Sequence, residues 1–361
     1  MREPPTDAAS PVATQIDAAS NDYLGYSRRA VSRATLLACE DERPGAGASR
    51  LIFGTAPIHL ALERELADWV GLESALLFSS GYAANLGVIA SLGRAGDLVV
   101  SDSLNHASII DGCRLSRATI RVVSHRKPEA VAHALREDAA RKFVVTESYF
   151  SMDGDLADLA ELRRVCDRAG AALIVDEAHA LGVFGPSGAG RCRALGVKPD
   201  VLIGTLGKAI GVQGAFVAGS HTLTTWLWNR ARSLVFSTGT APFLCAVCLE
   251  HVRRAREDEG GRQRLHENAR SLRARLRAGG VEVLDASEGP IVPIVLGDNA
   301  RAVRVAERLP RDGFRVQAIR PPTVPAGTAR LRVTVSAVLG DEELGRLGAS
   351  LIAACVESLN E

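Results

Sequence analysis

Short apolar segments alternate with segments of helical periodicity through the first 255 residues, and this alternation constrains the fold more than any other feature. The apolar segments are ALLFSS (75–80), DLVVSD (97–102), IRVVSH (120–125), KFVVTESYF (142–150), ALIVDEAH (172–179) and DVLIGTLG (200–207). They are continuous rather than alternating in polarity, which is typical of strands covered on both faces. We therefore predict an α/β fold with a mostly parallel central sheet and helices on both of its faces.

The pattern changes after about residue 255. A single charged helix is expected over 253–280, followed by shorter strands at VEVLDA (281–286), IVPIVLG (291–297), FRVQAIR (314–320) and ARLRVTVSA (329–337). In the last strand, apolar and polar positions alternate from Arg330 to Val335, which places them on opposite faces. We predict three parts, namely a loose N-terminal arm (1–20), a large α/β domain (21–255) and a smaller C-terminal α+β domain (256–361).

Charge and composition exclude several classes of protein. Lys and Arg total 43 and Asp and Glu total 42, so the net charge of +1 lacks the basic excess of a nucleic-acid or anionic-membrane binder. Residues 1–17 contain no apolar stretch typical of a signal peptide, and no apolar run reaches the roughly 18 residues of a membrane span. The seven cysteines show no disulfide spacing. We expect a cytoplasmic protein with neither a nucleic-acid nor a membrane partner.

Polar or glycine-rich clusters follow the predicted strands. Ligands of open α/β sheets bind at the carboxyl ends of the strands, so these clusters are expected to converge on one edge. The clusters are Ser80-Gly81-Tyr82, Asn105-His106, Glu147 with Ser151, Asp176 with His179, and Thr205 with Lys208.

Lys208 is the strongest candidate for chemistry. The chain has only four lysines, at positions 127, 142, 198 and 208, and Lys208 alone lies between small residues directly after an apolar strand. A partly buried amine in that place can form a Schiff base with a carbonyl or with pyridoxal phosphate (PLP). The alternative is a structural lysine whose aliphatic stem packs along the sheet edge.

Other strand-end residues suit the same cofactor. Asp176 could keep the pyridine nitrogen of PLP protonated, although a helix cap or a solvated strand end is an equal alternative. His106 could stack on a flat ligand or simply begin a helix. The backbone N–H groups of Gly81 and Tyr82, at a predicted helix start, could bind phosphate. The Thr238 hydroxyl could do the same, but ordinary turn chemistry explains it as well.

Taken in order, the motifs SGY, NHAS, TESYFSMDGD, VDEAHALGVFG and TLGKA resemble those of the α-oxoamine synthases, PLP enzymes of the fold type I transferases. The resemblance runs from Asn21 to about Leu347. GDNARAV (297–303) and RPPTVPAGTARLR (320–332) are most similar to the branch that makes 8-amino-7-oxononanoate for biotin. The resemblance implies a homodimer with shared active sites. This enzyme would condense L-alanine with pimeloyl-CoA or pimeloyl-acyl carrier protein, releasing CO2 and a thiol.

The resemblance also implies a role for each matching residue. Lys208 would hold PLP covalently, Asp176 would pair with the ring nitrogen and His106 would stack on the ring, and these three are the expected catalytic residues. The remaining expected cofactor contacts are Ser151 and His179 to the phenolic oxygen, Gly81, Tyr82 and Thr205 to the phosphate, and Thr238 to the phosphate of the neighbouring subunit.

Substrate contacts are implied at Asn21, His106, Thr323 and Arg332. The guanidinium of Arg332 would bind the carboxylate of the amino acid, a geometry that suits a bidentate pair. Glu147 would support the site without touching the reacting atoms, and no metal is expected.

Three alternatives stay open at this point. The nearest is a sister synthase, similar to 2-amino-3-ketobutyrate CoA ligase, which uses another amino acid or acyl-CoA. An aminotransferase would use the same cofactor without a thioester. A binding subunit that keeps the fold without catalysis is a more remote alternative.

Overall fold

The structure, a computed structural model, describes residues 15–39 and 44–359, which form two compact units. The larger unit comprises Asp22–Ser151 and Asp155–Leu265, and the smaller comprises the N-terminal segment up to Asn21, Met152–Gly154 and the chain from His266 onward. This division falls after Leu265, later than the expected boundary at 255/256. Residues 1–14 of the expected arm lie outside the described residues.

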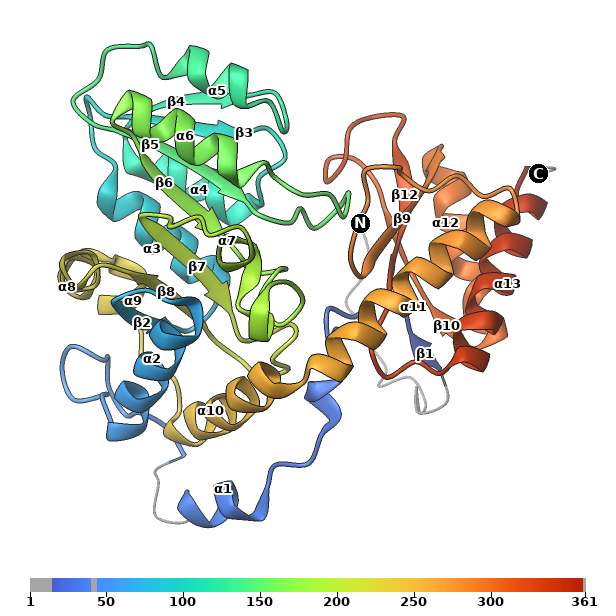
Figure 1. Cartoon of the computed structure of the whole chain (residues 1–361), viewed down its shortest axis with the longest axis horizontal. Coiled ribbons are helices and arrows are strands. Elements are labelled where there is room, and N and C mark those ends of the chain that lie inside the picture. Colours follow the sequence, from blue (N-terminus) through green and yellow to red (C-terminus); the bar gives the residue numbers. More distant parts are fainter. Residues whose placement is uncertain (1–14, 40–43, 360–361) are drawn as a thin grey trace. The chain divides into compact units, whose positions relative to one another are not determined.

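The larger unit contains a seven-stranded sheet of order β2-β8-β7-β6-β5-β3-β4 (Figure 1). Strands β7, β6, β5, β3 and β4 run parallel, and β8 pairs antiparallel with both β2 and β7. The prediction of a mostly parallel sheet is thus confirmed. The strands are β2 (Ser74–Phe78), β3 (Leu98–Asp102), β4 (Thr119–Val123), β5 (Lys142–Glu147), β6 (Ala172–Asp176), β7 (Val201–Thr205) and β8 (Ala215–Gly219).

Helices cover both faces of this sheet (Figure 1). On one face, Val99, Val145 and Ile174 pack in a core with apolar residues of α3 (Gly81–Leu92), α4 (Ala107–Ser116), α8 (His221–Arg230) and α9 (Arg232–Val235). Successive strand residues point to opposite faces, so Val100 and Val144 face α5 (Pro128–Ala134) and α6 (Leu159–Ala169). The unit also contains η2 (Tyr26–Arg28), α1 (Arg33–Ala38), α2 (Pro57–Val70), η3 (Pro186–Gly188), α7 (Gly190–Ala194) and α10 (Pro242–Glu257).

Two strands depart from the expectation of long, fully covered apolar runs. Strand β4 lies at the edge of the sheet and is largely exposed, with Val122 68% exposed, because only β3 pairs with it. Strand β8 is not among the predicted strands. Its segment AFVAG is short and follows a glycine-rich turn, so its apolar character is hard to separate from that of a loop.

The smaller unit is built on an antiparallel sheet of order β11-β12-β9, with β9 (Ile291–Gly297), β11 (Gln317–Ile319) and β12 (Ala329–Thr334). Its core joins this sheet to α11 (Glu259–Ala278), α12 (Asn299–Arg308) and α13 (Asp341–Glu357). A short pair, β1 (Ile16–Asp17) with β10 (Phe314–Arg315), ties the segment before Asn21 to this unit. The turn η4 (Leu309–Asp312) precedes β10.

Two expectations for the C-terminal region are wrong. The charged stretch over 253–280 is not one helix, because α10 ends at Glu257 and α11 begins at Glu259. The segment 281–286 is not a strand, and only Val283 forms an isolated bridge, with Ile294. Within the described parts of the chain, no helix is both long and apolar enough to span a membrane.

Candidate functional site

The carboxyl ends of the parallel strands bring the predicted polar residues to one edge of the sheet. Glu147, the last residue of β5, stands in register with Asp176, the last residue of β6. Both residues are buried, at 4% and 6% exposed. The strand pairing therefore sets two carboxylates side by side at the edge where open α/β sheets bind ligands.

Asp176 is held from two sides. Its Oδ2 accepts a hydrogen bond from Asn85 Nδ2 at 2.7 Å, and its Oδ1 accepts one from the backbone N–H of Ala178 at 2.8 Å. Asn85 is buried in α3 and also donates to the Ser108 hydroxyl at 3.0 Å. These bonds fix the carboxylate in one orientation at the strand end.

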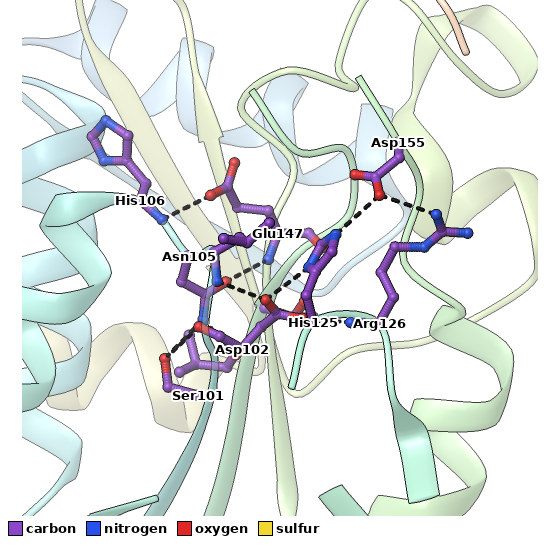
Figure 2. Close-up of polar contacts among 11 residues, drawn as sticks. Ser101, Asp102, Asn105, His106, His125, Arg126, Glu147 and Asp155 are labelled. Carbon is purple, nitrogen blue, oxygen red and sulfur yellow. Dashed lines mark hydrogen bonds and ion pairs between the residues drawn. The ribbon is translucent and has the colours of Figure 1, made fainter. Parts of the chain in front are cut away.

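His106 caps α4 and is joined to Glu147 by its backbone. Its N–H donates to Glu147 Oε1 at 2.7 Å (Figure 2). Its Nδ1 lies 2.8 Å from the Ser108 hydroxyl. His106 is accessible to solvent, yet the surrounding protein lowers the pKa of its imidazole, and the charge of Lys208 acts in the same direction. A neutral imidazole is thus favoured at neutral pH.

Burial raises the pKa of Glu147 to about 8, and the neighbouring charge of Asp176 adds to the rise. The Lys208 cation opposes it. Glu147 therefore favours its protonated form at neutral pH, which reduces repulsion between the two adjacent carboxyl groups.

Lys208 follows β7 and is half-buried. Its charge acts on the pKa of both His106 and Glu147, and the charge of Asp176 acts on the same two groups. The structure thus brings an amine, a fixed carboxylate and an imidazole into one electrostatic neighbourhood, as the sequence predicts.

The start of α3 offers unused backbone donors. Ser80 accepts hydrogen bonds from the N–H groups of Ala83, through its hydroxyl, and of Ala84, through its carbonyl. The N–H groups of Gly81 and Tyr82 have no acceptor among the described residues, as expected for the first turn of a helix. Thr205 lies close to Gly81. If residue 81 carried a Cβ atom, that atom would lie 3.9 Å from Thr205 Oγ1.

The side chains of Tyr82 and Thr205, two residues expected to contact the phosphate, form hydrogen bonds with other protein groups. The Tyr82 side chain is exposed and its hydroxyl donates to Asp111, so only the backbone N–H of Tyr82 is left for the predicted phosphate contact. The Thr205 hydroxyl donates to the carbonyl of Gly214 at 3.2 Å and accepts from the N–H of Gly207 at 3.2 Å.

His179 and Ser151 are both buried in the larger unit. His179 Nδ1 lies 2.7 Å from the hydroxyl of Tyr23, a side chain with no exposed surface. This contact fixes the direction of the imidazole ring. Thr238 is exposed and forms an isolated bridge with Ser49.

Of the four predicted substrate residues, Asn21, Thr323 and Arg332 belong to the smaller unit, whereas His106 belongs to the larger. Arg332, buried in β12, donates to Asn21 Oδ1 at 2.8 Å and to the Thr334 hydroxyl at 3.1 Å. The structure therefore joins Arg332 and Asn21. Thr323 is exposed in the turn that precedes β12.

Two organising residues are not predicted from the sequence: Asn85, which orients Asp176, and Tyr23, which orients His179. Asn105, from one of the predicted clusters, donates to Ser101 Oγ at 2.9 Å and to the Val145 carbonyl at 2.8 Å. Asn85 has a visible signal, because it is an amide inside the otherwise apolar helical stretch GYAANLGVIASL. A buried amide in such a place needs a polar partner.

The donor set at this edge fits PLP. Lys208 supplies an amine for the aldehyde, and Asp176 supplies a buried carboxylate for a ring nitrogen. The open N–H groups of Gly81 and Tyr82 supply donors for the phosphate at a helix N-terminus. The chemistry of each group thus matches one end or edge of the cofactor.

Known proteins resemble the chain over nearly its whole length. A model of the aminotransferase class I and II family matches residues 13–351. The chain is 49% identical to an 8-amino-7-oxononanoate synthase of Anaeromyxobacter dehalogenans, over 89% of this chain and 82% of that protein. It is 46% identical to one of Methylococcus capsulatus, over 93% of this chain and 88% of that protein.

Solved structures agree. A serine palmitoyltransferase variant from S. paucimobilis with bound PLP–myriocin aldimine has a TM-score of 0.91 and 31% identity, covering 96% of this chain and 89% of that one. An 8-amino-7-oxononanoate synthase from Francisella tularensis has a TM-score of 0.83 and 26% identity, covering 97% and 100%. The chain therefore belongs to the aminotransferase class I and II family and, within it, to the 8-amino-7-oxononanoate synthases.

Proposed function

We propose that the chain catalyses the PLP-dependent condensation of L-alanine with a pimeloyl thioester, giving 8-amino-7-oxononanoate, CO2 and the free thiol. The acyl donor is pimeloyl-CoA or pimeloyl-acyl carrier protein. The observation that carries the proposal is the grouping of Lys208, Asp176 and His106 at the carboxyl edge of the sheet. Relatives at 46–49% identity that carry this enzyme's name support it.

PLP, when bound, withdraws electrons from the substrate Cα and so makes loss of its proton and of CO2 feasible. Asp176 would keep the ring nitrogen protonated through a charge pair, and Asn85 and the Ala178 N–H hold that carboxylate in place. The neutral imidazole of His106 would stack on the ring, and the Ser151 and His179 side chains would hydrogen-bond the phenolic oxygen. The backbone at Gly81 and Tyr82, with the Thr205 side chain, would hold the phosphate.

Lys208 has two tasks. Between turnovers its Nζ would hold the cofactor covalently. Once freed by the incoming alanine, the amine would take the Cα proton as a general base, and it would return a proton to the same carbon at the end of the reaction. Overall, the thioester C–S bond breaks and the thiolate leaves, a C–C bond forms between Cα and the acyl carbon, and the C–C bond to the carboxylate breaks as CO2 is released.

Arg332 binds the alanine carboxylate in this proposal. Its guanidinium is buried and is already oriented by Asn21 and Thr334, which lowers the entropic cost of gripping a carboxylate. Thr323 is proposed to contact the substrate from the turn before β12.

We propose that the working form is a homodimer. Ile52, Phe53 and Phe236 are 65%, 83% and 72% exposed, and their segments are joined by the bridge between Ser49 and Thr238. Exposed large apolar side chains grouped in this way indicate an interface with a partner. A second copy of the chain would cover them and would place its Thr238 at the phosphate of the neighbouring site.

The compartment proposed for this reaction is the cytoplasm. All seven cysteines are buried thiols, in keeping with a reducing environment.

A spectroscopic experiment tests the function. The purified protein is titrated with PLP, then with L-alanine, glycine or L-serine, and finally with pimeloyl-CoA. We expect a spectral change with alanine, and release of CO2 and free CoA only when the thioester is added. CO2 release with glycine or serine but not with alanine would indicate a sister synthase. Conversion of PLP to its amine form by an amino acid alone would indicate an aminotransferase.

A further inference from the structure

A charged cluster ties together two loops that carry proposed cofactor contacts. It consists of Asp102 at the end of β3, His125 and Arg126 after β4, and Asp155 beyond Ser151, and we call it the β4 cluster (Figure 2). The loop after β3 leads to His106, and the loop after β5 carries Ser151. Nothing in the proposed chemistry uses these four side chains directly.

His125 stands between the two carboxylates. Its Nδ1 lies 2.9 Å from Asp102 Oδ1, and its Nε2 lies 2.9 Å from Asp155 Oδ2, so a single imidazole spans both loops. The Phe150 ring packs against it in a T-shaped arrangement, at a centroid distance of 4.4 Å and an interplanar angle of 89°. Asp155 is buried, the Asp102 side chain is 10% exposed, and the His125 side chain is 20% exposed.

Arg126 closes the cluster from the same turn. Its backbone N–H donates to Asp102 Oδ2 at 2.9 Å, and its guanidinium donates to Asp155 Oδ2 at 3.0 Å. The residue has a φ of 54°, a left-handed conformation that a non-glycine residue seldom adopts. Such a conformation persists where surrounding contacts enforce it, often near functional sites.

Each of the two aspartates, Asp102 and Asp155, anchors a segment that leads to a proposed cofactor contact. Asp102 accepts hydrogen bonds from the N–H of Leu104 through its side chain, at 2.8 Å, and from that of Asn105 through its carbonyl, at 3.2 Å. Asn105 precedes His106 and accepts the Glu147 N–H at 3.2 Å. The Asp155 carbonyl accepts the Phe150 N–H at 3.0 Å, which closes the loop that contains Ser151.

We propose that His125 is a positioning residue that holds the His106 loop and the Ser151 loop in register with each other at the sheet edge. The proposal rests on the roles given to His106 and Ser151 under the proposed function. With two carboxylates facing it and one guanidinium beside it, His125 favours its protonated form, and burial opposes this only in part. A doubly donating imidazolium bonds both carboxylates at once.

Substitutions that keep one contact at a time give the sharpest test. The amide of His125→Asn can replace the Nδ1 donor to Asp102, and the longer amide of His125→Gln can replace the Nε2 donor to Asp155, while His125→Ala removes both. Arg121→Gln is the matched control, because Arg121 also forms an ion pair, with Glu137 at 2.8 Å, but lies within the exposed strand β4 and anchors neither loop.

The measurements are the PLP dissociation constant, the position of the visible PLP band, and kcat and KM for alanine, together with the melting temperature of each variant without PLP. We expect His125→Ala to shift the band, weaken PLP binding and lower kcat by about 10- to 100-fold. A loss of this size is typical when catalytic groups are slightly misplaced. His125→Asn and His125→Gln should each recover part of this loss, and Arg121→Gln should match the wild type.

A purely structural role would give a different result. If His125→Ala lowered the melting temperature but showed the wild-type band and kcat once loaded with PLP, the positioning role would be overturned. If His125→Ala does not fold, His125→Asn and His125→Gln decide, and wild-type bands in both would overturn it. A wild-type protein that forms no PLP band at all would instead contradict the proposed function.

Discussion

The two units place their polar functional side chains in opposite ways. In the larger unit, Glu147 and Asp176 come at the last positions of their strands, and Lys208 comes after one. In the smaller unit, Arg332 lies inside β12, on the face that alternates with Leu331 and Val333. One unit uses strand ends and the other uses a strand face.

The sheets explain the difference. Helices cover both faces of the parallel sheet, so only the ends of its strands are left for polar groups. The antiparallel sheet of the smaller unit buries one face in an apolar core, which leaves the other face for guanidinium and hydroxyl groups that hydrogen-bond one another. Substitutions at the two kinds of position should therefore affect catalysis in different ways.

The largest effect is expected at a strand end. Asp176→Asn removes the charge that keeps the ring nitrogen protonated while leaving the shape of the side chain, so we expect kcat to fall by about 100- to 1000-fold. PLP binding should be largely retained. Steady-state kinetics and PLP titration check this, and a wild-type kcat would contradict the charge pairing.

A smaller effect is expected on the strand face. Arg332→Lys keeps the charge but loses the planar fork, so KM for alanine should rise by about 10- to 100-fold, as for loss of a charged hydrogen bond. Arg330→Lys on the same face is the control, because Arg330 pairs with Asp153 in that unit. An equal rise in KM for both variants would argue against a specific carboxylate site at Arg332.

The sequence predicts the residues at the strand ends well, but it predicts poorly the buried residues that orient them. Continuous apolar segments ending in polar residues lead to the parallel sheet and to the family, both of which are confirmed, and they also predict the site formed by Lys208, Asp176 and His106. The individual roles of these residues stay predictions. Asn85 bonds a residue 91 positions away, Tyr23 one 156 positions away, and His125 two that are 23 and 30 positions away. Such pairings depend on tertiary packing, which local sequence patterns do not contain.

Asn85→Ala tests one of these orienting residues. The variant leaves Asp176 Oδ2 and the Ser108 hydroxyl without their amide donor. We therefore expect the free energy of unfolding to fall by about 1–3 kcal/mol. A fall in kcat smaller than that of Asp176→Asn should accompany it. Denaturant unfolding and kinetics measure both. Asn229→Ala, on the exposed surface of α8, is the control, and an equal effect there would remove the special role of Asn85.

The smallest effect is a pH dependence at the β4 cluster. The two facing carboxylates raise the pKa of His125 from 6.5 to about 9, against the effect of burial. The stabilisation from this charge is complete below pH 6.5 and is lost as the pH rises from 6.5 through about 9. The difference in unfolding free energy between wild type and His125→Gln should shrink over that window. A difference that grew or stayed constant would contradict the charged pair.

Lys208 carries the cofactor in the proposed function, and the four lysines of the chain make a direct test of this role possible. The PLP-loaded protein is reduced with borohydride, digested and mapped by mass spectrometry. We predict the pyridoxyl label on the peptide containing Lys208, and no label at Lys127, Lys142 or Lys198. A label on any of those three instead, or none on a protein that binds PLP, would contradict the account.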